Sequence, residues 1–165
     1  MPESAAHGLR GRVEFRSNRA VADALIARVP ATVVASKSGP LAIQAGGDID
    51  LRIDALALAP SGSSGGVSAQ WRNARMVGAG LPVLDLGTLI AKLTVRGNAL
   101  AGPVLNQGGA VRISGDVSIG ADRVNADLRL QADASATPAV RTALEALGPA
   151  DANGAVALRV DQSTR

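Results

Sequence analysis

Aromatic residues and cysteine are almost absent from this chain of 165 residues. It contains one tryptophan, one phenylalanine, no tyrosine and no cysteine. The absence of cysteine excludes disulfides, thiolate metal sites and cysteine nucleophiles. Two aromatic rings leave little for stacking on nucleic-acid bases. Any core must be assembled from alanine, valine, leucine and isoleucine, which suits a long, curved or open sheet better than a compact globule.

Histidine is nearly absent as well. The only one, His7, lies in the first residues of the chain, and we expect residues 1–10 to be flexible. A Ser-His-Asp triad or a multi-histidine metal site would have to be built around that terminus. The alternating Asp48, Asp50 and Asp54 lack the clustered ligands of a calcium loop. The sequence therefore predicts a protein that is not an enzyme and that holds no metal and no cofactor.

Charge and hydropathy exclude further classes. The chain has 17 Lys and Arg against 14 Asp and Glu, a formal charge of +3, and these charges alternate along expected strands. This pattern is typical of a solvated sheet face and does not indicate nucleic-acid binding. The chain has no run of 18 or more apolar residues, so the sequence predicts no transmembrane helix. The first ten residues do not resemble a signal peptide. We expect either a protein soluble as such or a piece cut away from its targeting segment.

Alternation of apolar and polar residues with a period of two dominates the chain and predicts strands. In the longest expected strand, apolar residues occupy odd positions up to Ile53 and even positions from Leu56. A β-bulge near Asp54 and Ala55 would restore a single apolar face and bend the sheet. The expected strands are residues 12–16, 48–59, 66–74, 88–96, 99–105, 110–119, 124–132 and about 155–161, with short β-prone pieces at 32–35 and 41–45.

Two segments have helical spacing instead. Between a cap at Ser17 or Asn18 and Pro30, apolar residues recur at three- and four-residue intervals. Near the other end of the chain, Thr137 is expected to cap a helix with Pro138 in its first turn. The apolar residues that carry these two predictions are Ala22, Leu25, Ile26 and Val29 in the first helix and Val140, Leu144 and Leu147 in the second.

The predicted fold is therefore mainly β: one domain over residues 1–165, built on a strongly curved, open antiparallel sheet, or a partly open barrel, of about eight to ten strands with two short α-helices. Each end of the chain reads as strand, helix, strand. This suggests an internal repeat over about residues 11–54 and 124–161. An independent origin of the two units stays open.

Four segments carry a resemblance to a known family. They are residues 25–34 (Leu-Ile-Ala-Arg-Val-Pro-Ala-Thr-Val-Val), residues 66–74 (Gly-Val-Ser-Ala-Gln-Trp-Arg-Asn-Ala), the Asp85-Leu86-Gly87 step before a strand, and residues 138–154. None is a catalytic motif. In this order and spacing they resemble the type II secretion system protein N family, GspN, and the likeness extends more distantly to AsmA-like proteins.

The resemblance implies a non-enzymatic accessory or scaffold component of the machine that exports folded proteins across the outer membrane of Gram-negative bacteria. It implies the periplasmic part of an inner-membrane protein, with the membrane anchor missing from this sequence. The expected partners are inner-membrane platform proteins, secretin periplasmic domains, or both. The alternative, implied by the AsmA-like proteins, is a groove that carries a lipid or another hydrophobic molecule.

Two sets of residues are candidates for these roles. Trp71, with its neighbours Arg72 and Asn73, is a candidate anchor, either for packing in the sheet or for contact with a partner. The alternation places Val67, Ala69 and Trp71 on one face of their strand. The apolar groove of the alternative function would be lined by Leu51, Ile53, Leu89, Leu93, Val111 and Ile113.

Overall fold

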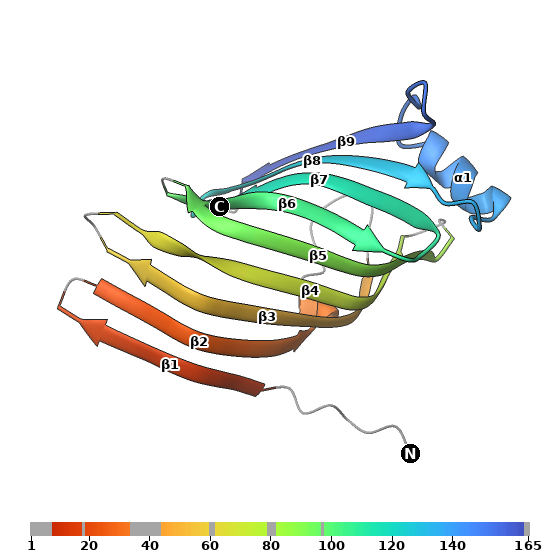
Figure 1. The fold of residues 1–165 in the computed structure, drawn as a ribbon. Helices are drawn as coiled ribbons and strands as arrows, with labels where there is room; N and C mark the ends of the chain where they lie inside the picture. Colours follow the sequence, from red (N-terminus) through yellow and green to blue (C-terminus); the bar gives the residue numbers. More distant parts are fainter. Residues whose placement is uncertain are drawn as a thin grey trace, which may run out of the picture.

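A single antiparallel sheet of nine strands makes up most of the protein. The computed structural model describes residues 8–17, 19–33, 44–59, 62–78, 82–96 and 98–163. The strands lie side by side in sequence order, and the sheet is bent and open, with β1 and β9 at opposite edges (Figure 1). The predicted mainly β, open architecture is confirmed. Its elements are β1 (Gly8–Arg16), β2 (Arg19–Pro30), η1 (Ala31–Val33), β3 (Gln44–Leu58), β4 (Ser64–Val77), β5 (Leu84–Arg96), β6 (Ala99–Gln107), β7 (Val111–Ile119), β8 (Arg123–Ala132), α1 (Pro138–Glu145) and β9 (Ala155–Ser163).

The first predicted helix is wrong, because residues 19–30 form strand β2. Ala24 has a positive φ of 48° and lies in a bulge opposite Gly11 of β1. The extra residue shifts the alternation by one, so Ala22, Leu25 and Val29 follow one another at intervals of three and four on one face of a strand. These intervals also match an α-helix, and the sequence pattern alone does not separate the two.

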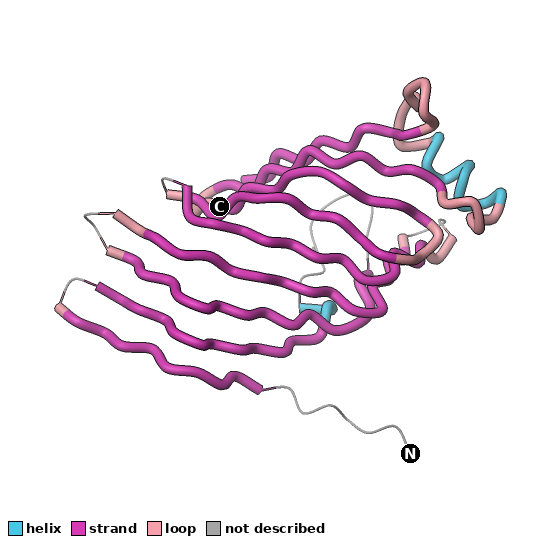
Figure 2. Tube along the Cα trace, viewed as in Figure 1, coloured by secondary structure: helices cyan, strands magenta, loops and turns pink. Residues whose placement is uncertain are grey.

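The second predicted helix is confirmed. Thr137 caps α1, its Oγ1 accepting a hydrogen bond from the backbone N–H of Val140 at 3.4 Å, and Pro138 is in the first turn. Val140 and Leu144 are buried, whereas Leu147 lies beyond the helix and is exposed. Among the described residues, α1 is the only α-helix. It lies at the end of the sheet next to β8 and β9 and is shown in cyan in Figure 2.

Three smaller expectations concern the first part of the chain. Residues 31–33 form a single 3₁₀ turn, so the β-prone piece expected from residue 32 is wrong at its start, while residues 34–43 lie outside the described part. Residues 1–7 of the expected flexible terminus also lie outside it, and Gly8 already belongs to β1. Residues 19–30, where the suggested repeat of residues 11–54 required a helix, form β2, whereas residues 124–161 contain β8, α1 and β9.

Two bulges bend the central strands. The predicted bulge is confirmed, since the β3–β4 register shifts between Ile53 and Ala55. A second irregularity, which the sequence did not reveal, lies after Trp71, where Asn73 has a φ of 50° and both neighbouring strands shift register. An extra residue increases local twist. The two bulges therefore bend the sheet at two places along its strands.

The core lies on one face of the sheet beneath α1. Its buried members come from five strands, the turn before the helix and the helix itself. Burial of this kind stabilises by about 25 cal/mol for each Å² of apolar surface removed from water. Among the described elements, none forms a second layer as large as the sheet itself. The core residues are Ala74, Leu86, Val111, Ile113, Leu130, Ala136, Val140, Leu144 and Val156.

Gly87 and Gly108 provide a matched test of the second bend. Both have positive φ, 66° and 72°, but a Cβ on Gly87 would collide with backbone atoms of Gln107 and Gly108, whereas a Cβ on Gly108 would meet nothing within 4 Å. We expect Gly108→Ala to lose about 1–2 kcal/mol from backbone strain alone, and Gly87→Ala to lose about 3 kcal/mol or more because the strands must also separate. Urea unfolding measures both free energies, and equal losses would contradict the close approach.

Candidate interaction surface

The register of the sheet defines two faces of opposite character. Partners in an antiparallel pair share a face, so a row of paired residues can be followed from strand to strand. One such row runs from Val29 through Ile49 and Trp71 to Leu89. We call the side that contains these rows the apolar face; its other rows consist of Ala27, Leu51, Ala69, Ala91, Val104, Gly115, Leu128 and Leu158, and of Leu25, Ile53, Val67 and Leu93.

The opposite side, which we call the polar face, carries most of the charged side chains of the strands. Its rows are Arg28, Asp50, Gln70, Ile90 and Leu105, and Ile26, Arg52, Ser68 and Lys92, and on the later strands Asp116, Asp127 and Arg159. This separation follows from the period-two alternation of the sequence. Each face is therefore continuous across many strands.

Trp71 lies on the apolar face in a half-buried position. Its ring packs against the core residues, and its indole Nε1 donates a hydrogen bond to the Gly46 carbonyl at 2.9 Å. Arg72, the next residue, points to the polar face, and Asn73 is exposed in the bulge. The three residues of the predicted anchor therefore do not form one surface: Trp71 packs inward and the other two face elsewhere.

The six predicted groove residues all lie on the apolar face. Leu93, Val111 and Ile113 are buried, while Leu51, Ile53 and Leu89 are half-buried. The structure thus brings them onto one side of the sheet but spreads them from β3 to β7, and Val111 and Ile113 belong to the core that also contains α1 residues.

Exposure of the apolar face increases along the strands. At the end near α1, Val111 is 1% exposed. At the opposite end, where the β1–β2, β5–β6 and β7–β8 turns lie, Val13 is 43% exposed and Phe15 is 82% exposed. The described helix therefore covers only one end of this face.

Ion pairs organise the polar face. Asp50 on β3 contacts Arg28 Nε on β2 at 2.6 Å and an Arg72 terminal nitrogen on β4 at 2.7 Å, so one carboxylate links three strands. The hydrogen bond to Asp50, followed by its charge, raises the pKa of the Arg28 guanidinium above its ordinary value. Arg52 and Asp54 form a more exposed pair at 2.6 Å. Two of the three carboxylates considered for a cation site, Asp50 and Asp54, thus have arginine partners.

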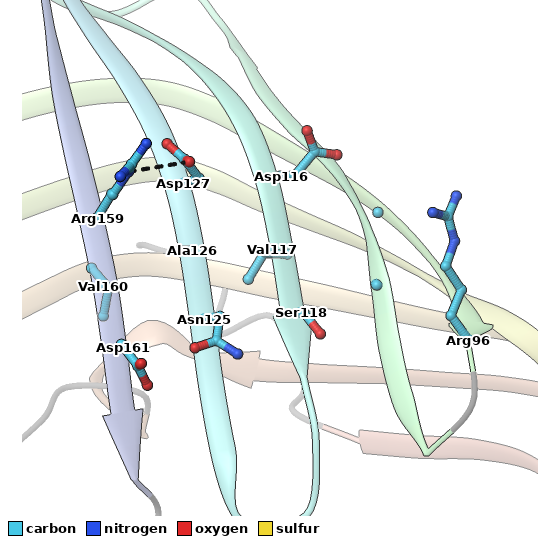
Figure 3. Close-up of a pocket in the computed structure, with 12 residues that line it drawn as sticks. Arg96, Asp116, Val117, Ser118, Asn125, Ala126, Asp127, Arg159, Val160 and Asp161 are labelled. Carbon is cyan, nitrogen blue, oxygen red and sulfur yellow. Dashed lines mark ion pairs between the residues drawn. The ribbon is translucent and has the colours of Figure 1, made fainter.

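The polar face has shallow depressions. One, of about 470 Å³, lies on β5–β9 and is open to solvent; Figure 3 shows Arg159 directed toward Asp127 in it, at 3.4 Å. A second, of about 450 Å³, lies around Arg28, Asp50 and Arg52. Opposite charges pair within both, Arg159 with Asp127 in the first and Arg28 with Asp50 in the second, whereas a catalytic site needs unpaired groups that converge.

Two aspartates hold the turns on either side of α1. Asp133 accepts hydrogen bonds from the backbone N–H and the hydroxyl of Ser135, which lower the pKa of its carboxyl, and Arg112 adds to this effect. Asp151 accepts from the backbone N–H groups of Ala155 and Asn153, which likewise lower its pKa. These carboxylates position the helix and the start of β9.

Sequence reasoning missed Asn106. It lies in the row of the apolar face, at the position opposite Leu89, and its amide nitrogen donates to the carbonyls of Leu86 and Val111 at 2.8 and 2.6 Å, while its oxygen accepts from the Ile113 N–H at 2.7 Å. One side chain thus joins β5, β6 and β7 where the β6–β7 ladder ends. A polar residue in an otherwise apolar row was the available signal.

The concentration of arginine at one edge was also missed. Arg10, Arg12, Arg16 and Arg19 all lie on β1 or at the start of β2. In the sequence they are separated by apolar and acidic residues, so no basic run is visible. Only the pairing of β1 with β2 shows that they share one hairpin.

Fold and surface together define a class: an open, single-layer β-sheet protein with one apolar and one polar face. In the part of the chain that the structure covers, no three His, Cys, Asp or Glu side chains are grouped to hold a metal ion. A family model of the type II secretion system protein N matches residues 2–159, and the chain belongs to that family.

Proteins of this family are components of a secretion system and are generally not catalytic. Other components of that system are therefore the implied partners. Comparison with curated proteins found no match, and comparison with solved structures found none either. Of the helices that the structure describes, none has the length and apolar character to span a bilayer.

Trp71→Phe tests the hydrogen bond that the indole makes to the Gly46 carbonyl. The substitution keeps a ring on the apolar face but removes the donor to the Gly46 carbonyl, so we expect a loss of about 1 kcal/mol in unfolding free energy. Phe15→Ala, at a side chain exposed by 82%, is the control and should change stability by less than about 0.5 kcal/mol. Urea unfolding followed by circular dichroism distinguishes them; an unchanged Trp71→Phe variant would contradict a stabilising role of this hydrogen bond.

Asp151→Asn tests the turn before β9 through pH. Because the folded-state pKa of Asp151 is lowered, its stabilising contribution is fully present above the unfolded pKa of about 3.9 and is lost as pH falls through the folded pKa. The stability difference between the parent and the variant should therefore be largest near pH 6 and shrink toward pH 3. Asp161→Asn, in an exposed pair with Arg123, is the control and should have little effect at either pH. A difference independent of pH would contradict the assignment.

Proposed function

We propose that this protein is a non-enzymatic scaffold or adaptor of the type II secretion system, acting at the periplasmic face of the inner membrane. In this role it docks to inner-membrane platform proteins, to the periplasmic domains of the secretin, or to both. Family membership supports the system, and the open sheet supports the mode of docking. The observation that carries the proposal is that the sheet ends in two edge strands, β1 and β9.

Edge strands bind other chains because their outer backbone N–H and C=O groups are unpaired. Addition of a strand to such an edge is a recurring mode of protein recognition. The edge of β9 is partly covered at its start, where the Asp151 N–H donates to the Ala155 carbonyl at 2.8 Å and Ala150 bridges to Val156. Along β1, the described residues place no strand on the outer side.

The faces support a scaffold over a catalyst. On the polar face, the arginines around Asp50, Asp54 and Asp127 are matched by carboxylates at 2.6 to 3.4 Å. Groups that neutralise one another in open solvent stabilise geometry but do not provide an activated acid, base or nucleophile. Membership of the type II secretion system protein N family supports the proposed periplasmic location.

Photo-crosslinking in a secreting bacterium tests the docking mode. A photoreactive residue at Glu14 on β1 or Ala157 on β9 should crosslink to a platform or secretin protein, because these positions lie on edge strands. Gln70, exposed in the middle of the polar face on β4, is the control and should give little crosslinking.

Two outcomes would count against this function. One is equal crosslinking from Gln70 and from both edges, which indicates random proximity. The other is failure of purified platform and secretin domains to bind the protein at all, measured by pull-down. Loss of exoprotein secretion on gene deletion would support a required role.

A second candidate function rests on a different observation, the incompletely covered apolar face. The residues Leu51, Ile53, Leu89, Leu93, Val111 and Ile113 share that face, and exposure rises toward the end remote from α1. A continuous exposed apolar surface is typical of a binding site. On this proposal the sheet carries a lipid or similar hydrophobic molecule.

Native mass spectrometry of the purified protein tests this second function. A co-purified lipid, lost in the variant Leu93→Asp but retained in Lys92→Asp on the opposite face, would support it. A protein that is lipid-free after isolation from membrane-containing lysate, and that takes up no fluorescent fatty acid, would rule it out.

A further inference from the structure

The positive charge of the protein is concentrated on the β1–β2 hairpin. Strands β1 and β2 contain five arginines and two acidic residues, a net charge of +3. The whole chain also carries +3, from 17 basic and 14 acidic residues. The remainder therefore holds equal numbers of each sign, so this edge is the basic part of an otherwise balanced molecule.

The arginines of β1 lie on one side of the strand. Arg10 and Arg12 alternate with apolar-face positions and are exposed. At the tip of the hairpin Arg16 is directly opposite Arg19, an arrangement of like charges that destabilises a strand pair. Within the described part, Arg10, Arg12 and Arg19 have no ion-pair partner, and Arg16 has a loose contact with Glu14 at 3.6 Å.

Apolar side chains occupy the other side of β1. Val13 is 43% exposed and Phe15 is 82% exposed, the largest exposure among the large hydrophobic side chains that the structure describes. Phe15 pairs across the hairpin with Ala20, which is too small to cover the ring. An exposed phenylalanine at a free edge costs solvation free energy that a neighbouring strand would recover.

We propose that the outer edge of β1 is a docking site for an extended, acidic segment of a partner protein, which adds to the sheet as a tenth strand. The segment alternates acidic residues, opposite the arginines, with apolar residues, opposite Val13 and Phe15. This inference rests on the proposed scaffold function and specifies which edge and which chemistry serve it.

Three observations favour a polypeptide over the other anionic partners. A nucleic acid would use the arginines but not the unpaired backbone edge, and the chain has few aromatic rings for stacking. A membrane surface would use the arginines and Phe15 together, but the arginines and Phe15 point to opposite sides of β1. A strand lying beside β1 contacts both sides and the backbone at once.

The test uses the intact chain and three labelled ten-residue peptides, one alternating glutamate with valine, one alternating lysine with valine and one alternating glutamate with serine. We expect fluorescence anisotropy to show binding of the Glu-Val peptide, weaker binding of the Glu-Ser peptide and none of the Lys-Val peptide. Hydrogen exchange should show new protection of amides in β1 and no new protection in β9.

Matched variants locate the site. The double substitution Arg10→Glu and Arg12→Glu should weaken binding of the Glu-Val peptide about tenfold, from loss and reversal of two exposed charge contacts. The control, Lys92→Glu with Arg96→Glu, makes the same charge change on β5 and should leave binding unchanged. Phe15→Ala should weaken binding of the Glu-Val peptide but not of the Glu-Ser peptide. Fluorescence of Trp71 verifies that each variant is folded.

Several results would overturn the proposal. They are equal binding of the Lys-Val peptide, unchanged binding in the Arg10 and Arg12 double variant, or protection that appears away from β1. Binding of single-stranded DNA or phosphatidylglycerol vesicles through the same arginines, without binding of the Glu-Val peptide, would assign the hairpin to that class of partner. If the peptide fails while crosslinks from β9 to secretion components persist, the scaffold function stands and the assignment of β1 falls.

Discussion

The structure depends on one constraint: a sheet with one apolar face and very few bulky side chains must find cover for that face. Within the described residues, α1 is the only α-helix, and it buries the ends of β7, β8 and β9 through Val140 and Leu144. Trp71 supplies the largest ring near the core and is fixed by its bond to the Gly46 carbonyl. Cover is therefore uneven, and the exposed remainder of the apolar face is where a hydrophobic ligand would bind if the second function holds.

The polar face has a different requirement. Charged side chains on neighbouring strands attract one another only when their charges are opposite. Asp50 meets this requirement for β2, β3 and β4 through Arg28 and Arg72. Exposed pairs of this kind contribute little stability individually. They do oppose slippage of one strand past another, because a shift by one residue would place apolar side chains among the charges. On the β1–β2 hairpin, Arg10, Arg12 and Arg19 have no ion-pair partner among the described residues, and this group of unpaired arginines distinguishes that edge.

The sequence predicted the class of fold, the terminal helix and the bulge near Ala55, because alternation, an N-cap with proline, and a change of phase each have one physical interpretation. It misjudged residues 19–30, since a bulge at Ala24 reproduces helical spacing within a strand. It also missed Asn73 and Asn106, whose roles arise from neighbours on other strands. The two faces were predicted strand by strand, but the basic hairpin required the pairing of strands to be known.

The strictly sequential order of the strands has a mechanical consequence. Every strand pairs only with its neighbours in the chain, so contacts are short in sequence and cooperativity resembles that of a linear array of repeating units. In such an array the terminal hairpin detaches at the cost of a single interface. Tension applied to the N-terminal end would therefore peel β1 and β2 away first and leave the strands beneath α1 intact, so that the body keeps its shape while its edge yields.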